Sequence, residues 1–336
     1  MIEKIFDDLY RLEIPLPRSP LKALNSYLIR GEDRFLIIDT GMNRETCLKA
    51  MRSCLQELNV DLNKTDFFIT HLHADHLGLI GHLATDTSKV YFSRAEARVI
   101  SGNEKPSAER RAEGMKFYIA CGFPEEELKT AVENHPGFRY SPQRKVDFTQ
   151  LQEGDTITIG GYAFSCIDTP GHSPGHMCLY EPRKKLFISG DHILIDITPN
   201  ITNWADLDNS LKSYLTNLMK VYDLEIDLVL PGHRNLIRDH RKRIDELQEH
   251  HRDRLAEVLV ALKEGEKTAW QIAPHITWDI DFRSWEDFPP VQKWFALGET
   301  LAHIDYLKAE GKINKREEKG RFLFSLVKLS GTGLAF

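Results

Sequence analysis

Apolar and polar positions along the first third of the chain predict short, buried strands. From Leu24 to Asp39 two apolar runs flank the turn cluster Gly31–Asp33, which predicts a β-hairpin. Apolar residues recur at helical spacing over about 44–58, and another short apolar run over 66–70 ends abruptly in histidines. We therefore expect a strand that delivers His71 to a loop.

The middle of the chain predicts a helical insertion followed by a second set of strands. Polar-rich helical patterns over 108–120 and 125–132 are separated by Gly122-Phe123-Pro124, and we place the insertion at about 93–148. An amphipathic helix over 211–222 precedes the last strand of the second set. The strands of this set are predicted at 156–159, 162–167, 176–180, 185–189 and 228–230. Strands and helices in two similar halves predict a layered α/β sandwich.

From about His240 the pattern changes to long amphipathic helices. Apolar residues from Ile244 to Leu262 form one face of a helix that Gly265 ends, and a second helix is expected at about 290–310. Two short apolar runs around Gly320 then predict a terminal hairpin. We interpret residues 1–239 as one large domain, which contains the insertion, and 240–336 as a small winged-helix-like domain.

Composition narrows the class of protein. The chain has 336 residues, of which 41% are hydrophobic and 28% charged, and its net charge of −6 gives no general attraction for nucleic acids or anionic membranes. The five cysteines include no C-x-x-C pair, so we expect neither a disulfide framework nor a thiolate zinc site. No leader pattern and no apolar run of about 20 residues is found. We expect a cytoplasmic protein that does not bind membranes.

Histidines and aspartates gather where predicted strands end. The segment Thr70–His76 contains His71, His73, Asp75 and His76 directly after an apolar strand. Three later strand ends each carry one further residue of this kind: His172, Asp191 and His233. Imidazole and carboxylate suit borderline and harder divalent ions, which favours zinc, with iron or manganese as alternatives. The sequence thus predicts a metal site with enough ligands for two ions.

Together with Asp39-Thr40-Gly41, these residues resemble the five ordered motifs of the metallo-β-lactamase superfamily over residues 24–233. The resemblance implies an αββα sandwich with a dinuclear site at one edge of two facing sheets. It implies that one metal is held by His71, His73 and His172, the second by Asp75, His76 and His233, and that Asp191 bridges them. Asp39 corresponds to the non-ligand acid of the family, which supports the histidine loop.

The retained ligands indicate the branch of the family. Asp75, His76, Asp191 and His233 occur together, as in hydrolases with two occupied sites, whereas the antibiotic-degrading enzymes use Cys in the second site. Two metal ions can bind a shared water, lower its pKa towards about 7 and so provide a bridging hydroxide as nucleophile. Asp75 and Asp191 are candidates for proton transfer. We expect a glyoxalase-II-like hydrolase of a small ester, thioester or lactone.

Two other functions stay open. The C-terminal pattern resembles the winged-helix extension of a branch that includes β-lactamase-like RNA endonucleases, so a phosphodiesterase is the first alternative. Residues 240–336 carry 16 basic and 16 acidic residues, which disfavours nucleic acid as a partner relative to a small molecule. The second alternative is a di-iron redox or sensor protein, although no glycine-rich cofactor segment follows the metal motifs. The C-terminal domain is expected to pack on the catalytic domain or to form a homodimer.

Other residues are weighed against plainer explanations. His176, His82 and His192 are interpreted as structural, and the basic residues of the terminal hairpin as solvated. Phe117, Tyr118 and His135 of the insertion either line the substrate pocket or pack its helices together. We expect specificity to reside in 93–148 and in the C-terminal domain.

Overall fold

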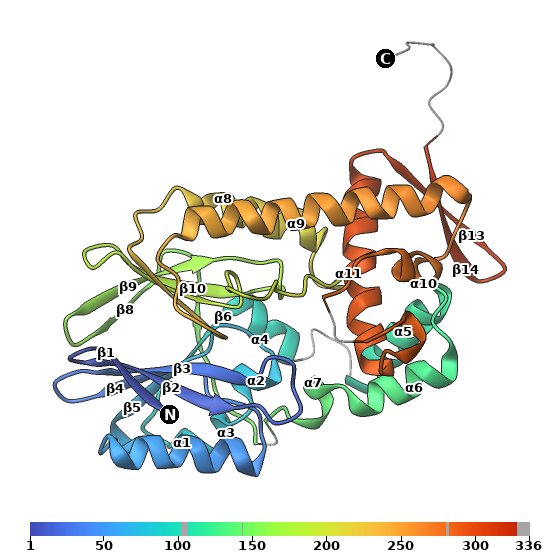
Figure 1. The fold of residues 1–336 in the computed structure, drawn as a ribbon. Coiled ribbons are helices and arrows are strands. Elements are labelled where there is room, and N and C mark those ends of the chain that lie inside the picture. Colours follow the sequence, from blue (N-terminus) through green and yellow to red (C-terminus); the bar gives the residue numbers. More distant parts are fainter. Residues whose placement is uncertain (102–106, 143, 280–281, 328–336) are drawn as a thin grey trace. The chain divides into compact units, whose positions relative to one another are not determined.

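The chain forms two compact units in the computed structural model, which describes residues 1–101, 107–142, 144–279 and 282–327 (Figure 1). The first unit comprises 1–103, 135–200 and 204–247. The second comprises 104–134, 201–203 and 248–336.

A seven-stranded sheet forms half of the first unit. Its strands follow the chain order: β1 (Ile2–Phe6), β2 (Leu9–Pro15), β3 (Ala23–Arg30), β4 (Phe35–Ile38), β5 (Thr65–Phe68), β6 (Val90–Ser93) and β7 (Thr149–Leu151). The first four strands pair antiparallel, so the predicted hairpin is confirmed as β3 and β4, and the pairs from β4 to β7 are parallel. The connections contain α1 (Glu45–Glu57), η1 (Leu62–Lys64), α2 (Ala74–Leu77), α3 (Ile80–Leu83), α4 (Arg94–Ser101) and α7 (Pro136–Arg139).

The second half of this unit is a five-stranded sheet in the order β12-β11-β10-β9-β8. Its strands are β8 (Thr156–Ile159), β9 (Tyr162–Asp168), β10 (Met177–Glu181), β11 (Leu186–Gly190) and β12 (Leu228–Pro231). All pairs are antiparallel except β11 with β12, which are parallel and joined through α8 (Ser210–Tyr222). A tight turn can join only antiparallel strands, so a parallel pair needs such a crossover connection.

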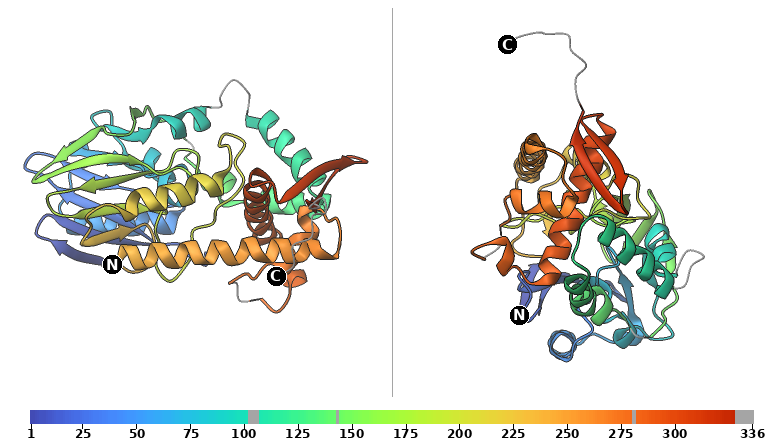
Figure 2. Two further views of the ribbon diagram at one scale, coloured as in Figure 1. Left: turned by 90° about the horizontal axis from the view of Figure 1, so that it is seen from above. Right: turned by 90° about the vertical axis from the view of Figure 1, so that its right-hand side faces the viewer.

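The two sheets face each other across one apolar core. Side chains from both sheets meet there, including Leu36 and Phe68 from one sheet and Phe164 and Leu230 from the other. A second core lies between the outer face of the seven-stranded sheet and α1 to α3. On the outer face of the five-stranded sheet lies α8 (Figures 1 and 2). The predicted αββα sandwich is confirmed.

The second unit has its own core. It consists of α5 (Ser107–Ala120), α6 (Glu125–Asn134), most of α9 (His240–Ala261), η2 (Leu262–Glu264), α10 (Ala269–Ile272), η3 (Ala273–His275), η4 (Trp285–Asp287), α11 (Pro290–Ala309) and the hairpin β13 (Ile313–Glu318) and β14 (Arg321–Leu326). Helices α5 and α6 of the insertion share this core with α11 and β14. Residues 104–134 of the predicted insertion thus group with C-terminal residues by contacts, whereas its two ends belong to the first unit. The division into domains at 239/240 and the winged-helix identity stay predictions.

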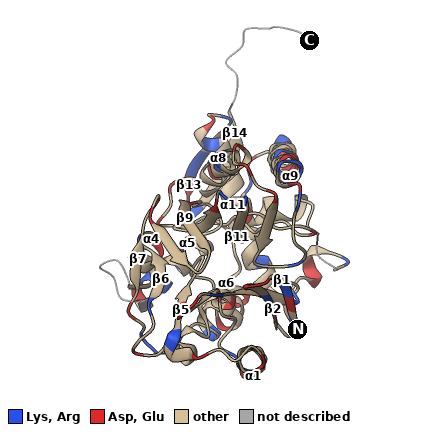
Figure 3. Cartoon of the chain, turned by 90° about the vertical axis from the view of Figure 1, so that its left-hand side faces the viewer, with Lys and Arg blue, Asp and Glu red and all other residues tan. Residues whose placement is uncertain are grey.

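Charged residues of both signs follow the long helix α9. Figure 3 shows its Lys and Arg side by side with its Asp and Glu. Pairs three residues apart form ion pairs, such as Arg243 with Glu246 at 2.9 Å. Interspersed charges of this kind are typical of a solvated helix face and give it no net field. No helix in the described part of the chain is long and apolar enough to cross a membrane.

Candidate metal centre

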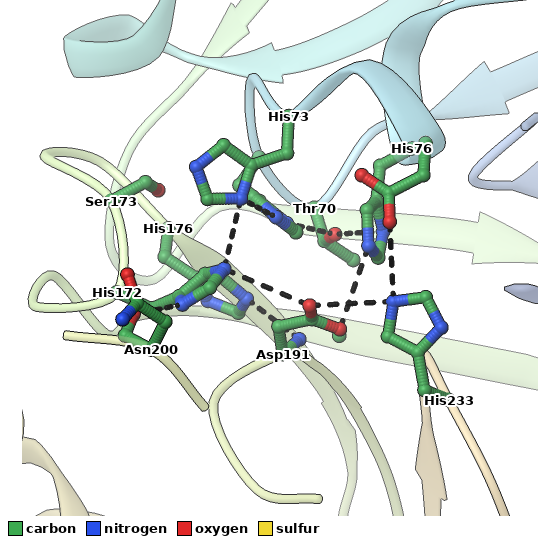
Figure 4. A network of polar contacts seen from close by, with 12 residues as sticks. Thr70, His73, His76, His172, Ser173, His176, Asp191, Asn200 and His233 are labelled. Atoms are coloured by element: carbon green, nitrogen blue, oxygen red, sulfur yellow. Dashed lines mark hydrogen bonds and ion pairs between the residues drawn. The ribbon is translucent and has the colours of Figure 1, made fainter. Parts of the chain in front are cut away.

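The predicted ligands lie together at one edge of the sandwich (Figure 4). His71 and His73 follow β5, and helix α2 begins immediately after them, which places Asp75 and His76 on its first turn. The remaining ligands come from the five-stranded sheet: His172 from the β9–β10 loop, Asp191 directly after β11 and His233 just after β12. Residues up to 162 positions apart in the chain therefore meet because their strands end at the same edge.

Three histidines converge in the first group of ligand atoms. His71 Nε2 and His73 Nδ1 are 3.0 Å apart, and His172 Nε2 lies 2.9 Å from the same His73 nitrogen. Figure 4 shows the rings of His73 and His172 turned toward each other. Three imidazole nitrogens that face one point form a natural site for a cation.

The second group contains Asp75, His76 and His233, with His233 Nε2 3.4 Å from Asp75 Oδ2. Asp191 lies between the two groups. Its Oδ2 is 3.6 Å from His172 Nε2 and 3.4 Å from His233 Nε2, and its Oδ1 is 3.5 Å from His76 Nε2. One carboxylate thus faces histidines of both groups, as a bridging ligand requires.

The spacing of these atoms fits a bound divalent ion. Zinc ligands at about 2.0–2.1 Å from the metal stand roughly 3.4 Å apart at tetrahedral angles. The separations here run from 2.9 to 3.6 Å. Three buried atoms, His76 Nε2, Asp191 Oδ1 and His233 Nε2, make no hydrogen bond to any described residue. Since buried polar atoms are normally satisfied, these residues fit a metal site.

Hydrogen bonds to the ring nitrogens that face away from the site determine which nitrogen of each histidine offers its lone pair to a metal. In three of the histidines Nδ1 faces an oxygen that can only accept a hydrogen bond, so Nδ1 carries the proton and Nε2 offers its lone pair. These oxygens lie at 2.7–2.8 Å and belong to Asp39 for His76, Asn200 for His172 and Ala23 for His233. Such anchoring of the second nitrogen is the usual arrangement of metal-binding histidines.

Asp39 holds the histidine loop, in the position that the resemblance implied. Its Oδ1 accepts from the Thr70 backbone N–H at 2.9 Å, and its Oδ2 accepts from the Thr70 hydroxyl at 2.9 Å and faces His76 Nδ1 at 2.7 Å. The Thr70 oxygen in turn lies 2.9 Å from His71 Nδ1. Asp39 itself has φ of 58°, a strained backbone for a non-glycine residue that is common at functional sites.

Electrostatics draw positive charge to this cluster. Burial opposes charge on His233, but the carboxylates of Asp191 and Asp75 raise its pKa to about 10. Burial alone would raise the pKa of Asp75, whereas the close contact with His233 and the charges of His76 and His233 lower it to about 2. Burial lowers the pKa of His73 to about 3. Protons or a divalent cation can neutralise the carboxylates, and a cation would displace the protons.

Three residues at the site were not predicted as functional. Glu96 on α4 accepts hydrogen bonds from the backbone N–H groups of Leu72 and Gly175. Leu72 lies between His71 and His73, and Gly175 follows His172 by three residues. Trp204 stacks on His73 with ring centroids 6.0 Å apart and donates to the His172 carbonyl at 3.0 Å. Neither has a sequence signal, because the residues that each contacts are distant from it in the chain.

The third is His176, for which the sequence favours a structural role. It is not among the ligand groups, but its Nε2 accepts from the Asp191 backbone N–H at 3.1 Å and so holds the bridging acid in place. His192 is buried against Tyr214, and His82 is exposed and bonded to Asn43, so neither belongs to a ligand group.

The aromatic residues of the insertion pack inside the second unit. Tyr118 stacks on Trp294 with centroids 4.6 Å apart, and Phe117 packs near Phe322. His135 Nδ1 accepts from the Gly137 N–H at the start of α7. For all three the structure supports helix packing or capping, the plainer of the two explanations.

An open depression of about 590 Å³ lies on the surface of the first unit and is lined by none of the metal ligands. Its wall includes Ala23, whose carbonyl anchors His233, and the next residue after that histidine, Arg234. Arg11, Lys22 and Asp196 contribute charges of both signs. Its volume is within the range of about 300–1,000 Å³ typical of small-molecule sites.

Comparisons with known proteins agree with this geometry. Residues 21–233 match the family profile described as the metallo-beta-lactamase superfamily, and residues 255–326 match that of the metallo-beta-lactamase-like C-terminal domain. The probable metallo-hydrolase YqjP of Bacillus subtilis is 25% identical over 331 residues, which cover 96% of this chain and 99% of that protein. The human acyl-coenzyme A thioesterase MBLAC2 is 28% identical over 225 residues, 63% of this chain and 73% of that protein.

Solved structures extend the similarity to the whole chain. A metallo-beta-lactamase family protein from Thermus thermophilus is 28% identical with a TM-score of 0.80, and the match covers 96% of this chain and 100% of that one. A beta-lactamase domain protein from Burkholderia ambifaria is 25% identical with a TM-score of 0.76 over 97% of this chain and 95% of that one. The chain is therefore a metallo-hydrolase that belongs to the metallo-beta-lactamase superfamily.

Proposed function

We propose that this protein binds two divalent metal ions and hydrolyses a small ester, thioester or lactone, with a thioester as the first candidate. The observation that carries the proposal is the pair of ligand groups joined by Asp191, whose two oxygens face histidines of both groups at 3.4–3.6 Å. Seven ligand residues exceed what one tetrahedral ion needs.

Bound metal ions supply an activated water and polarise the carbonyl oxygen, so the chain needs no Ser or Cys nucleophile. Its own residues orient these parts. His172 and His233 are held by backbone carbonyls, and His76 by Asp39, so the lone pairs that face the site cannot turn away. Asp75 and Asp191 are the acids nearest the reacting atoms and are our candidates to carry the proton to the leaving group.

The donor set supports zinc, with iron or manganese as alternatives. The ligand groups offer imidazole nitrogen and carboxylate oxygen only, and all five cysteines are buried outside them. Such ligands suit zinc and also harder divalent ions, so the metal loaded in the cell depends on availability as well.

A small acyl substrate is supported by a relative and by the surface. The human relative is named an acyl-coenzyme A thioesterase. In the terminal hairpin, whose basic residues are candidates for contact with nucleic acid, Arg316 already pairs with Glu266 and Glu318, and Lys315 lies 3.5 Å from the centre of the Phe322 ring.

Metal analysis combined with a substrate panel tests the proposal. We expect about two metal ions per chain. Turnover of an acyl-coenzyme A thioester should stop on chelation and return with added zinc. Preferred turnover of a bis-phosphodiester would favour the phosphodiesterase alternative, and iron with visible absorbance the redox alternative. Full thioesterase activity in a metal-free preparation would refute the metal mechanism.

A further inference from the structure

Glu96 is a fully buried carboxylate that belongs to no ligand group. It lies on α4, in the same unit as the metal centre. Its Oε2 accepts from the Leu72 N–H at 3.1 Å, and its Oε1 accepts from the Gly175 N–H at 2.8 Å and from the Ser173 hydroxyl. The two oxygens thus bind two different loops.

These two loops carry all three histidines of the first group. Leu72 is the residue between His71 and His73, and Ser173 directly follows His172. Figure 4 shows Ser173 beside His172. The carboxylate therefore connects the loop of His71 and His73 with the loop of His172, although Ser173 and Gly175 follow Glu96 by 77 and 79 residues.

The backbone around Glu96 is shaped for this contact. The Ser93 hydroxyl accepts from the Glu96 N–H at 3.1 Å and fixes the start of α4. A Cβ on Gly175 would lie 2.6 Å from Ala95 Cβ and 2.8 Å from Glu96 N, so only glycine lets the loop approach this closely. Burial raises the pKa of Glu96 to about 7 even though the Ser173, Gly175 and Leu72 groups donate to it. Burying a carboxylate is costly unless hydrogen-bond donors stabilise it, so Glu96 depends on these three donors.

We propose that Glu96 is the positioning residue of the first metal group, in the way that Asp39 is for the second. Asp39 binds Thr70 and His76, whereas Glu96 binds the backbone of the two loops that carry His73 and His172. The proposal rests on the dinuclear function proposed above. Loss of Glu96 should therefore weaken one metal site and leave the other intact.

Glutamine cannot replace the carboxylate here. The site presents two backbone N–H donors, one to each side, and the amide of Gln has only one acceptor oxygen. One N–H would then face the amide NH₂ group. The Glu96→Gln variant keeps the volume of the side chain and removes one of the two loop attachments.

The test measures the metal affinities of apo protein by competition with a chromophoric chelator, using zinc. In Glu96→Gln we expect one site to bind 10- to 100-fold more weakly, the usual effect of losing a group that orients a ligand, and the other to be unchanged. The kcat should fall at limiting zinc and recover in excess zinc, with KM unchanged. Glu181→Gln is the matched control, because Glu181 is equally buried in this unit but binds Arg183 and Lys184.

A second background assigns the weakened site. His73→Ala removes a first-group ligand, so adding Glu96→Gln to it should not change the affinity of the remaining site. If Glu96→Gln fails to fold, Ser173→Ala removes one donor only and should weaken the same site to a smaller degree. Wild-type affinities in Glu96→Gln, or equal losses at both sites, would overturn the role of Glu96. A wild-type protein that does not bind two ions would overturn the dinuclear function itself.

Discussion

Asp191 is the residue on which both metal groups depend. It follows β11 directly, and its oxygens lie 3.4–3.6 Å from three histidines. Asp191→Asn keeps the shape but removes the negative charge that a bridging ligand supplies. We expect kcat to fall by about 100-fold or more, as for loss of a major electrostatic group, and the metal content to drop. Kinetics in excess zinc and metal analysis check this, with the exposed Asp223→Asn directly after α8 as control; near-normal turnover would contradict the bridging role.

Gly232 marks how tightly the site is packed. A Cβ at this position would lie 2.5 Å from Asp191 Oδ1 and 2.8 Å from His76 Cε1. Gly232→Ala should therefore displace both ligands and weaken metal binding, at a cost in stability of about 1–3 kcal/mol. Gly161→Ala is the control, because its Cβ would meet no atom within 4 Å. Equal metal affinity in the two variants would contradict this packing argument.

At the residue scale, the metal ligands could be predicted from the sequence, whereas the residues that position them could not. His71, His73, Asp75 and His76 stand at recognisable spacing after a strand, so their chemistry can be read locally. Glu96 looks like a charge on a polar helix, because its partners Ser173 and Gly175 become neighbours only when the two sheets close on each other. Hydrogen bonds to backbone atoms leave no pattern in residue type.

At the scale of elements, the strands predicted in the sandwich agree with the structure within one or two residues, because apolar runs between turn residues are local signals. Strands β1, β2, β6 and β7 were not predicted, and neither was the packing partner of the insertion helices. Phe123 and Leu128 of the insertion share a core with Leu297 and Ile304 of α11. The pattern of an amphipathic helix predicts that one of its faces is buried, but not which element covers that face.

Helices α9 and α11 bury two histidines that predict a pH dependence. His251 Nδ1 and His303 Nε2 are 3.1 Å apart. Burial lowers the pKa of His303 to about 3 and that of His251 well below its ordinary value, and the positive charge of Arg254 adds to both shifts. Between pH 6.5 and these values the unfolded chain binds protons that the folded chain does not. Stability is therefore present above pH 6.5 and is lost as the pH falls.

The expected size is about 2 kcal/mol for His303 between pH 6.5 and 5, from 1.36 kcal/mol per pH unit. Urea unfolding of metal-loaded protein at pH 7 and 5 measures it. His303→Gln removes one titrating group and should reduce the loss by about this amount. An unchanged pH dependence in His303→Gln would show that this histidine is not neutral in the fold.

At the scale of the whole molecule, metal binding should contribute to folding, because the ligands come from loops of both sheets. Each site stabilises the native state by about 2.7 kcal/mol when free metal is 100 times its Kd. Chelation should thus lower the unfolding temperature of the sandwich, and added zinc should restore it. Differential scanning calorimetry of apo and loaded protein checks this. Identical transitions in both forms would mean that the ions bind without holding the loops together.

Net charge separates the two hydrolase hypotheses. A protein that neutralises 6–10 phosphates loses roughly 10³–10⁵ in affinity between 50 and 200 mM salt. This chain has a net charge of −6, and the hairpin cation Arg316 is paired with Glu266 and Glu318. We therefore expect kcat/KM for a short-chain thioester to change less than about twofold over this range, since few counterions are released. Measurement at matched free zinc isolates the effect of salt from metal loss. A steep decline would contradict this expectation, and a bis-phosphodiester that is turned over with a higher kcat/KM and a steep salt dependence would favour the phosphodiesterase.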